Sequence, residues 1–253
     1  MQPIKKTALF TIFILLVALS SCTKGRKIKV QTWYDENQSA LKEEYFVKQK
    51  EPEIRDGAYK EFYRSGKVSV EKNYANGELE GKFIFYDEDG NKKEEAEYKA
   101  GKLDGKRILY FSNGQKEIEE TYRAGEYEGP YSEYFAENKP KQQGQYIKGA
   151  MGGVWKFYFE SGALKEEVEF KDNAENGAYK SYFENGKPES EGSFKDGLRS
   201  GDWKYYNENG TVSVEGHYEN DLQNAVEKRY NEEGKMTQEV IYKNGMPDKI
   251  TNY

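Results

Sequence analysis

Residues 201–224 read Gly-Asp-Trp-Lys-Tyr-Tyr-Asn-Glu-Asn-Gly-Thr-Val-Ser-Val-Glu-Gly-His-Tyr-Glu-Asn-Asp-Leu-Gln-Asn, and this unit recurs without a gap through most of the chain. We number the positions of each copy from 0 at its opening residue. Eight copies follow one another at a spacing of 24 residues, and positions 5 and 17 are aromatic in every copy. A fixed period of this length predicts a repeat architecture. The opening residues are Gly57, Gly81, Gly105, Gly129, Gly153, Gly177, Gly201 and Ala225.

Each copy carries two turn signals. Position 9 is Gly in seven copies and Asn138 in the fourth, which predicts a two-residue turn at positions 8 and 9. A second turn is predicted at positions 19 and 20, as in residues 76–77, with residues 172–173 and 220–221 as variants without Gly. The runs between the turns have the length of strands and are rich in Tyr, Phe, Trp and Val. Each copy is therefore predicted to be two antiparallel strands.

The register of these strands can be tested within the sequence. A turn at positions 8 and 9 pairs residues whose position numbers sum to 17, so position 3 faces position 14 and brings Lys and Glu together. Position 2 then faces position 15, which sets a large ring opposite a small residue, as in Trp203 with Gly216; where the ring is missing, Arg107 faces Glu120. The predicted charge pairs are Lys60–Glu71, Lys156–Glu167, Lys180–Glu191, Lys204–Glu215 and Lys228–Glu239.

Alternation along the strands assigns the two faces of the sheet. Positions 2, 4, 6, 15 and 17 share an apolar side, and positions 3, 5, 12, 14 and 16 share a side of Lys, Glu and Tyr. A single layer would expose more apolar surface than soluble monomers tolerate. We expect the sheet to coil so that its apolar side becomes an interior, because Gly144, Gly192 and Gly216 permit tight curvature there.

The pattern G-x-W-K-x-Y-x-x-N-G-x-x-x-x-E-x-x-Y-x-x-G, seen in residues 177–197 and 201–218, resembles the bacterial variant of the MORN (membrane occupation and recognition nexus) repeat. Proteins with this repeat are often described as YwqK-like antitoxin components. The resemblance covers residues 57 to about 247 and implies an elongated antiparallel sheet without catalytic residues. The expected fold is all-β, an elongated, twisted, single-layer antiparallel meander of about 16 to 18 strands, built from eight two-strand repeats.

The N-terminus has the features of a bacterial lipoprotein signal. Lys5 and Lys6 precede a twelve-residue apolar run, and residues 19–22 read Leu-Ser-Ser-Cys, which fits the lipoprotein box. The apolar run is short for a transmembrane span. We therefore expect lipidation of Cys22, the only cysteine; a plain cleaved signal peptide or a short anchor helix is the alternative.

The segment boundaries follow from these signals. Residues 1–21 are the expected signal peptide, and residues 22–30 the lipidated Cys and a tether. By resemblance to Gram-negative lipoproteins, Thr23 after the Cys implies sorting to the outer membrane. Residues 24–27 lack the acidic run of a surface-export signal, which favours the periplasmic side. We expect attachment to this membrane through the lipid.

The remaining chain is expected to be a capped repeat array. Residues 31–56 resemble a degenerate repeat that caps the stack, with strands at residues 33–34 and 41–47, and residues 57–253 form the array. Residues 246–249 follow the last full strand and would discourage edge pairing, and residues 250–253 form a half-strand.

Catalytic chemistry finds little support in the sequence. His217 is the only histidine and occupies a solvent-facing position where other copies carry Asn, Glu, Gln or Ser, so no catalytic triad can be assembled. The glycines do not form a phosphate-binding motif, and Lys pairing explains the glutamate column better than metal binding does. Removing Lys5 and Lys6 leaves 37 basic and 45 acidic residues, a net charge of −8, which disfavours nucleic acid. We expect no enzyme activity, no cofactor and no metal.

The tyrosines at position 5 are the candidate binding residues. A row of rings on a polar face could stack sugars or hold an extended peptide. The other interpretation, which we favour, is that each ring covers the Lys and Glu side chains beside it. The residues are Tyr86, Tyr110, Tyr134, Tyr158, Tyr182, Tyr206 and Tyr230.

Two functional hypotheses follow. The preferred one is a non-enzymatic, membrane-tethered scaffold in the cell envelope that binds an unidentified protein partner, with a homodimer as one option. The alternative is a lipoprotein that binds glycan or peptide along the tyrosines. An antitoxin role rests on the resemblance alone, and the lipoprotein signal argues against a cytoplasmic target.

Overall fold

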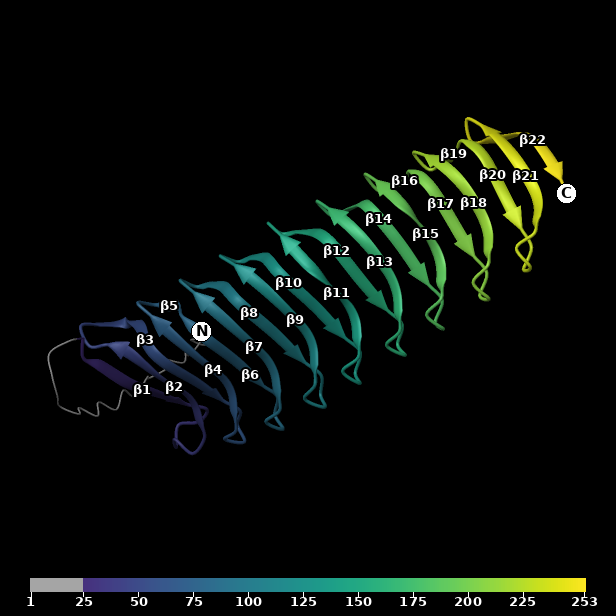
Figure 1. Cartoon of the computed structure of the whole chain (residues 1–253). Helices are drawn as coiled ribbons and strands as arrows, with labels where there is room; N and C mark the ends of the chain where they lie inside the picture. Colours follow the sequence, from purple (N-terminus) through teal and green to yellow (C-terminus); the bar gives the residue numbers. More distant parts are fainter. Residues whose placement is uncertain (1–24) are drawn as a thin grey trace, which may run out of the picture. The chain divides into compact units, whose positions relative to one another are not determined.

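The computed structural model describes residues 25–253, and this part of the chain contains 22 strands and no helix. The expected all-β antiparallel meander is confirmed. The chain divides into two compact units, Met1–Gly105 and Lys106–Tyr253. Figure 1 shows that, within each unit, consecutive hairpins lie side by side in chain order. The pairings within each unit are antiparallel and join strands that are close along the chain.

The first unit contains the N-terminal cap and the first two copies of the repeat. Its sheet is one layer thick. The strands are β1 (Lys27–Trp33), β2 (Leu41–Lys48), β3 (Glu51–Phe62), β4 (Val68–Ala75), β5 (Glu78–Leu79), β6 (Gly81–Tyr86) and β7 (Lys92–Lys99), and the unit boundary falls within β8 (Lys102–Tyr110).

The second unit contains the remaining six copies, again as one layer. Its strands after β8 are β9 (Lys116–Arg123), β10 (Glu126–Tyr134), β11 (Pro140–Ile147), β12 (Ala150–Tyr158), β13 (Leu164–Lys171), β14 (Ala174–Tyr182), β15 (Pro188–Lys195), β16 (Leu198–Arg199), β17 (Gly201–Tyr206), β18 (Val212–Glu219), β19 (Leu222–Gln223), β20 (Ala225–Tyr230), β21 (Met236–Lys243) and β22 (Met246–Asn252).

The predicted hairpin register is confirmed, but the predicted length of the turn that closes the hairpin is wrong. Lys60 pairs with Glu71, as expected. The loop has three residues rather than two, because Gly66 N–H donates to the Tyr63 carbonyl at 2.8 Å and Tyr63 N–H donates to the Lys67 carbonyl at 2.8 Å. A register shift next to Phe62 compensates for this loop. A β-turn followed by a left-handed Gly is the common three-residue hairpin.

The second turn is confirmed as a two-residue turn. Asn76 and Gly77 have φ angles of 52° and 89°, and both residues of a type I′ turn require positive φ. The variant without Gly at residues 172–173 has φ angles of 52° and 68°. Asn and Asp tolerate this conformation better than other residues with side chains. The turn that closes each hairpin and the turn that leads to the next copy are therefore of different types.

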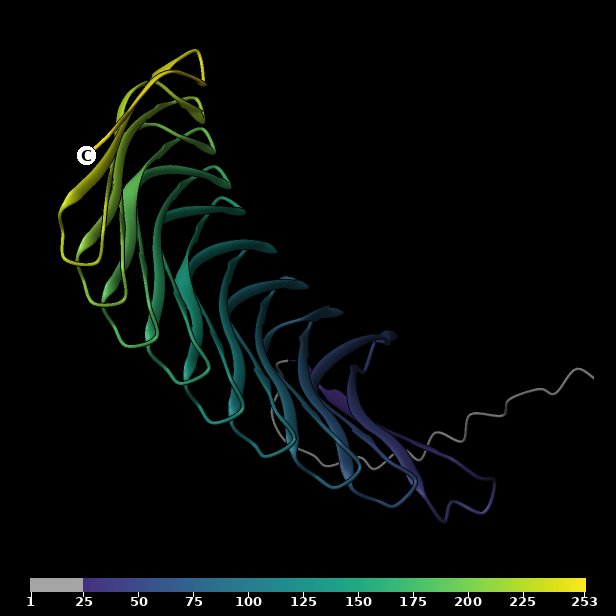
Figure 2. The ribbon, with the colours of Figure 1, turned by 90° about the vertical axis from the view of Figure 1, so that its right-hand side faces the viewer.

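A bulge at the start of each copy was not predicted. Phe194 pairs with Arg199, and Glu191 pairs with Lys204. Between these two pairs one strand advances by three residues, from 191 to 194, and the other by five, from 199 to 204. Gly201 lies in this bulge with a φ of 82°. Figure 2 shows the strands of the second unit bent along their length, as bulges bend strands. The bulge also separates the short strands β5, β16 and β19 from their successors, which explains most of the excess over the expected strand number.

The apolar side of the sheet is covered by its own rings, and we call it the ring face (positions 2, 4, 13, 15, 17 and 22). In the second unit, Trp155 and Trp203 are only 1% and 3% exposed. The ring of Trp203 lies 5.1 Å from that of Phe194 and 5.4 Å from that of Tyr179. This face is thus closed by contacts among neighbouring copies.

Trp155 and Trp203 each lie over a glycine of the preceding copy, and for Trp203 this is not the glycine that the sequence suggested. Trp203 pairs with Gly216 in its own hairpin, as predicted. A Cβ atom on Gly192, in the preceding copy, would however overlap the Trp203 indole ring. The indole N–H also donates to the Ser193 carbonyl of that copy, at 3.2 Å. The ring therefore leans towards the N-terminal neighbour.

The two ends of the array differ from the sequence expectation. β1 begins at Lys27, so residues 27–30 are strand rather than tether, and the first cap strand lies earlier than residues 33–34. The second cap strand is confirmed as β2. At the other end, β22 includes Met246–Asn252, so residues 246–249 belong to the same strand as the half-strand expected at residues 250–253. A single Pro at an edge strand removes one donor without ending the pairing.

The leaning of the ring gives a testable asymmetry between two glycines. Gly192→Ala should lower the free energy of unfolding in urea by about 1–3 kcal/mol, because the new methyl group overpacks a buried indole. Gly216→Ala is the matched control, since the single close contact of its Cβ would be with the end of the flexible Gln223 side chain, with Nε2 at 2.6 Å, while Glu227 Cβ lies at an ordinary contact distance of 3.8 Å. Equal losses for both variants would contradict this packing.

Candidate functional site

The tyrosines at position 5 lie on the opposite face of the sheet, which we call the Glu–Tyr face (positions 3, 5, 14 and 16). All seven are half-buried. In the first unit, the Tyr86 hydroxyl donates to Glu71 at 3.3 Å. In the second unit, four hydroxyls donate to position 14 of the preceding copy, so these hydroxyls are engaged within the sheet. These bonds are Tyr158–Gln143 at 3.0 Å, Tyr182–Glu167 at 3.3 Å, Tyr206–Glu191 at 2.6 Å and Tyr230–Glu215 at 2.6 Å.

Tyr110 and Tyr134 complete the column. Tyr110 ends β8 and is half-buried like the others. For Tyr134, the corresponding acid is Glu119, which accepts instead from the ammonium groups of Lys106 at 2.7 Å and Lys116 at 2.6 Å. Both lysines hold the pKa of Glu119 below its ordinary value. The position-5 column is therefore regular in its placement but not in its hydrogen bonds.

The predicted Lys–Glu pairing is present in part. Lys60 and Lys156 form ion pairs with Glu71 and Glu167 at 2.6 Å and 2.7 Å. Lys228 lies opposite Glu239, as predicted, but forms its ion pair with Glu215 of the preceding copy, at 3.7 Å. A lysine at position 3 thus has an acid on either side, because position 14 of two copies flanks it. Such exposed pairs each contribute little to stability.

One carboxylate on the ring face is deeply buried and fully partnered. Glu120 is 2% exposed. It accepts from Arg107 at 2.8 Å, as the register predicted, and from the hydroxyls of Tyr122 and Tyr127 at 2.9 Å each. A buried charge needs such partners to offset its loss of hydration. Glu120 is accordingly a structural group.

Position 22 of each copy also faces the rings, although the sequence pattern assigned it to neither face. Arg55, at this position in the cap, stacks its guanidinium on three tyrosines, 5.0 Å from the ring centres of Tyr45 and Tyr59 and 5.5 Å from that of Tyr74. Arg199 lies 4.1 Å from the ring centre of Tyr218. The residues of this column, taken unit by unit, are Arg55, Leu79 and Leu103, and then Tyr127, Met151, Glu175, Arg199 and Gln223.

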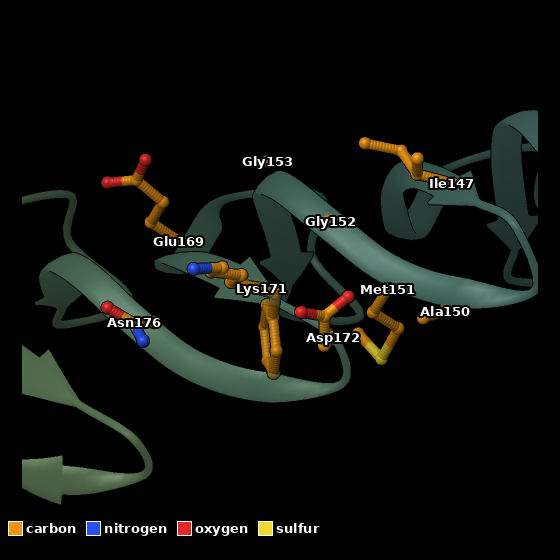
Figure 3. A pocket seen from close by; sticks show the side chains of 10 residues that line it. Ile147, Ala150, Met151, Gly152, Gly153, Glu169, Lys171, Asp172 and Asn176 are labelled. Carbon is orange, nitrogen blue, oxygen red and sulfur yellow. The ribbon is translucent and has the colours of Figure 1, made fainter.

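A shallow cavity of about 440 Å³ lies at the bulge of the fifth copy. Figure 3 shows Ile147 and Glu169 on opposite sides of it, with Lys171 and Asp172 between them. Gly152 lines this cavity and stands where the preceding copy has Glu128. A Cβ on Gly152 would lie 2.9 Å from Ile147 Cδ1. Its charged groups have both signs and do not converge on one kind of ligand.

The other predicted residues lie apart from any site. His217 is on the Glu–Tyr face with its Nδ1 atom 2.8 Å from Asp202, and both side chains are largely exposed. Among residues 25–253, no group of three His, Cys, Asp or Glu side chains is placed to hold a metal ion. No helix of the described part of the chain is long and apolar enough to cross a membrane. Cys22 and the expected signal peptide lie outside the described residues.

A comparison with protein families matches the chain to the MORN repeat variant. The seven matched windows cover more than half of the chain. They leave out the fourth copy, in which Asn138 and Gln143 replace the usual Gly and Glu. The matched residues are 55–76, 79–100, 103–124, 151–172, 175–196, 199–220 and 223–244.

Comparisons with individual proteins add only distant similarities. No curated protein matches the chain. Among solved structures, the chain is similar to the crystal structure of TcdB2-TccC3-Cdc42, with 11% identity over 87% of this chain and a TM-score of 0.20. A Tc holotoxin pore from Photorhabdus luminescens gives 11% identity over 86% of this chain and a TM-score of 0.19. This chain spans only 13% and 17% of those two chains.

The hydrogen bond of Tyr206 to Glu191 gives a prediction about pH. Burial and this bond raise the pKa of Tyr206 from its ordinary 10.0 to about 12. The neutral phenol therefore stabilises the fold fully below pH 10, and this contribution is lost as the pH rises through about 12. Ultraviolet difference titration of wild type against Tyr206→Phe should show one tyrosine that ionises near pH 12.

The same substitution should lower the free energy of unfolding at neutral pH by about 1 kcal/mol, because Glu191 loses a donor. Tyr134→Phe is the matched control, since Glu119 takes its donors from Lys106 and Lys116. A loss for Tyr134→Phe as large as that for Tyr206→Phe would contradict the assigned role of the bond.

Proposed function

The chain belongs to the MORN repeat variant family, and on this premise we propose that it is a non-enzymatic repeat scaffold that binds a protein partner. The lipid expected on Cys22 would hold the array at a membrane of the cell envelope, and Thr23 favours the outer membrane, facing the periplasm. Repeat arrays present extended surfaces on a regular frame, and protein binding is their common use.

One observation carries this proposal: the frame of the array is constant while one column of its ring face varies. Positions 5 and 17 are aromatic in every copy, and they hold neighbouring strands together. Position 22 lies on the same face as the position-17 rings, with no such constancy, and carries apolar, acidic, basic and amide side chains. A partner that contacts this column would meet a different side chain at each step of the array.

The alternative, glycan or peptide binding along the position-5 tyrosines, has less support. A ligand would compete with the acids that already accept the hydroxyls of Tyr206 and Tyr230 at 2.6 Å. An antitoxin role would need a toxin within reach of an envelope protein, so it is not part of the proposal.

Replacing the candidate tyrosines tests which face is used. Proximity labelling from the full chain in its native cell should identify the same partner when Tyr134, Tyr158 and Tyr182 are all changed to Ser, because the ring face is retained. The triple Phe variant is the matched control, since it keeps the rings and removes the hydroxyl groups. Loss of the partner in the Ser variant, with a wild-type circular dichroism spectrum and the partner kept by the Phe variant, would favour the tyrosine column.

The tether is tested by Cys22→Ser. This variant cannot be lipidated at position 22, so the chain should move from the membrane fraction to the soluble envelope fraction and lose incorporation of radiolabelled palmitate. Full retention of the variant in the membrane fraction would show that another feature holds the chain there.

A further inference from the structure

The position-22 side chains lie between rings on the ring face. In the second unit, Arg199 pairs with Phe194, and Glu175 pairs with Phe170 one repeat earlier. In the first unit, Arg55 pairs with Val47 in the same way. The three residues occupy equivalent places, so the surroundings of the two arginines indicate what the place around Glu175 can hold.

Both arginines use the following copy as a stacking surface. Arg55 lies over Tyr74 and Arg199 over Tyr218, and both tyrosines are at position 17. A guanidinium group above an aromatic ring is attracted by its π electrons and stacks on its plane. At the place of Glu175, the position-17 ring of the following copy is Phe194.

A carboxylate lies beside the stacked arginine in the cap. The Tyr59 hydroxyl donates to Glu43 at 2.6 Å, and Arg55 lies 4.0 Å from the same carboxylate. The second unit repeats this arrangement, since the Tyr179 hydroxyl donates to Glu166 at 3.2 Å. The ring and the carboxylate that accompany an arginine are therefore both present near Glu175.

Glu175 itself has no partner for its charge. Among residues 25–253, its carboxylate makes no hydrogen bond or ion pair, and the side chain is half-exposed. Burial, Glu166 and Asp221 together raise the pKa of Glu175. The nearest position-22 cation, Arg199, is bonded to Asp221 at 3.0 Å. Two carboxylates and a ring thus surround a place that holds a guanidinium in two other copies.

We infer that this place on the ring face receives an arginine side chain from the partner polypeptide, whose guanidinium stacks on Phe194 and pairs with Glu175 and Glu166. The inference rests on the proposed scaffold function and names the chemistry of the partner. A guanidinium suits the place because its flat face matches a ring and its N–H groups match carboxylates. A metal ion would need more oxygen ligands than these two side chains supply.

Acetyl-Gly-Arg-Gly-amide is a suitable probe, and its citrulline analogue is a control of the same shape without the charge. The chain has three tryptophans, and the Trp203 ring lies 5.1 Å from Phe194. Titration of the full chain should shift the Trp203 indole N–H signal in nuclear magnetic resonance spectra and leave that of Trp33 in place. The citrulline peptide should bind at least about tenfold more weakly. Equal binding of the two peptides, or no shift of Trp203, would overturn the inference.

Variants at Glu175 sharpen the test. Glu175→Arg restores the residue type of the two arginine copies, so it should abolish the peptide response and raise the melting temperature. Glu184→Arg, on an exposed loop of the second unit, makes the same change of charge and should keep the response. If Glu175→Arg fails to fold, Glu175→Gln should bind the arginine peptide about tenfold more weakly. Wild-type binding by a folded Glu175 variant would overturn the inference.

The result can be separated from that for the scaffold function. A partner labelled equally well by wild type and by Glu175→Arg would refute the arginine site and leave the scaffold in place. A Glu175-dependent peptide response without any labelled partner would support the site and refute the scaffold.

Discussion

A single layer of β-sheet has no second layer to cover its apolar side, so the rings on that side must cover one another. In the second unit this is achieved by close stacking, in which Trp203 contacts Tyr179 and Phe194 and is nearly inaccessible to water. The contact requires Gly192 beneath the indole, because any side chain there would occupy the same space. The same arrangement occurs two copies earlier, where Trp155 lies over Gly144.

The sequence predicted the elements that depend on local pairing. The register is confirmed by Lys60 opposite Glu71 and Trp203 opposite Gly216. It was predictable because opposite charges or a ring facing a small residue mark the same register in several hairpins. The two-residue turns are confirmed because both of their residues need positive φ, which Asn, Asp and Gly adopt most easily. The three-residue loop was mistaken for a shorter one because the compensating register shift leaves the pairing of the rest of the hairpin unchanged.

Contacts between copies were harder to predict than contacts within them. The opening glycine marks the period in the sequence. Its role in a bulge, where Gly201 has a positive φ of 82°, depends on contacts between copies that the sequence pattern does not show. Trp203 covers Gly192 of the preceding copy rather than its own partner Gly216. Of the candidate site, the position-5 column and its acids were recognised. Position 22 was missed because it lies beyond the second turn, outside the hairpin on which the register was based.

The leaning of Trp155 and Trp203 towards the preceding copy gives the second unit a direction. A copy offers a bare glycine to its C-terminal neighbour, as Gly144 does to Trp155 and Gly192 does to Trp203. The N-terminal copies emerge from the ribosome first. At these two junctions the glycine is therefore synthesised before the tryptophan that covers it. At these junctions, an array interrupted during synthesis ends on an unoccupied glycine, whereas one that lost its N-terminal copies would begin with an uncovered indole. The first kind of fragment exposes a patch of backbone to solvent, whereas the second exposes a large apolar ring. Synthesis from the N-terminus therefore produces the intermediate that is less prone to aggregate.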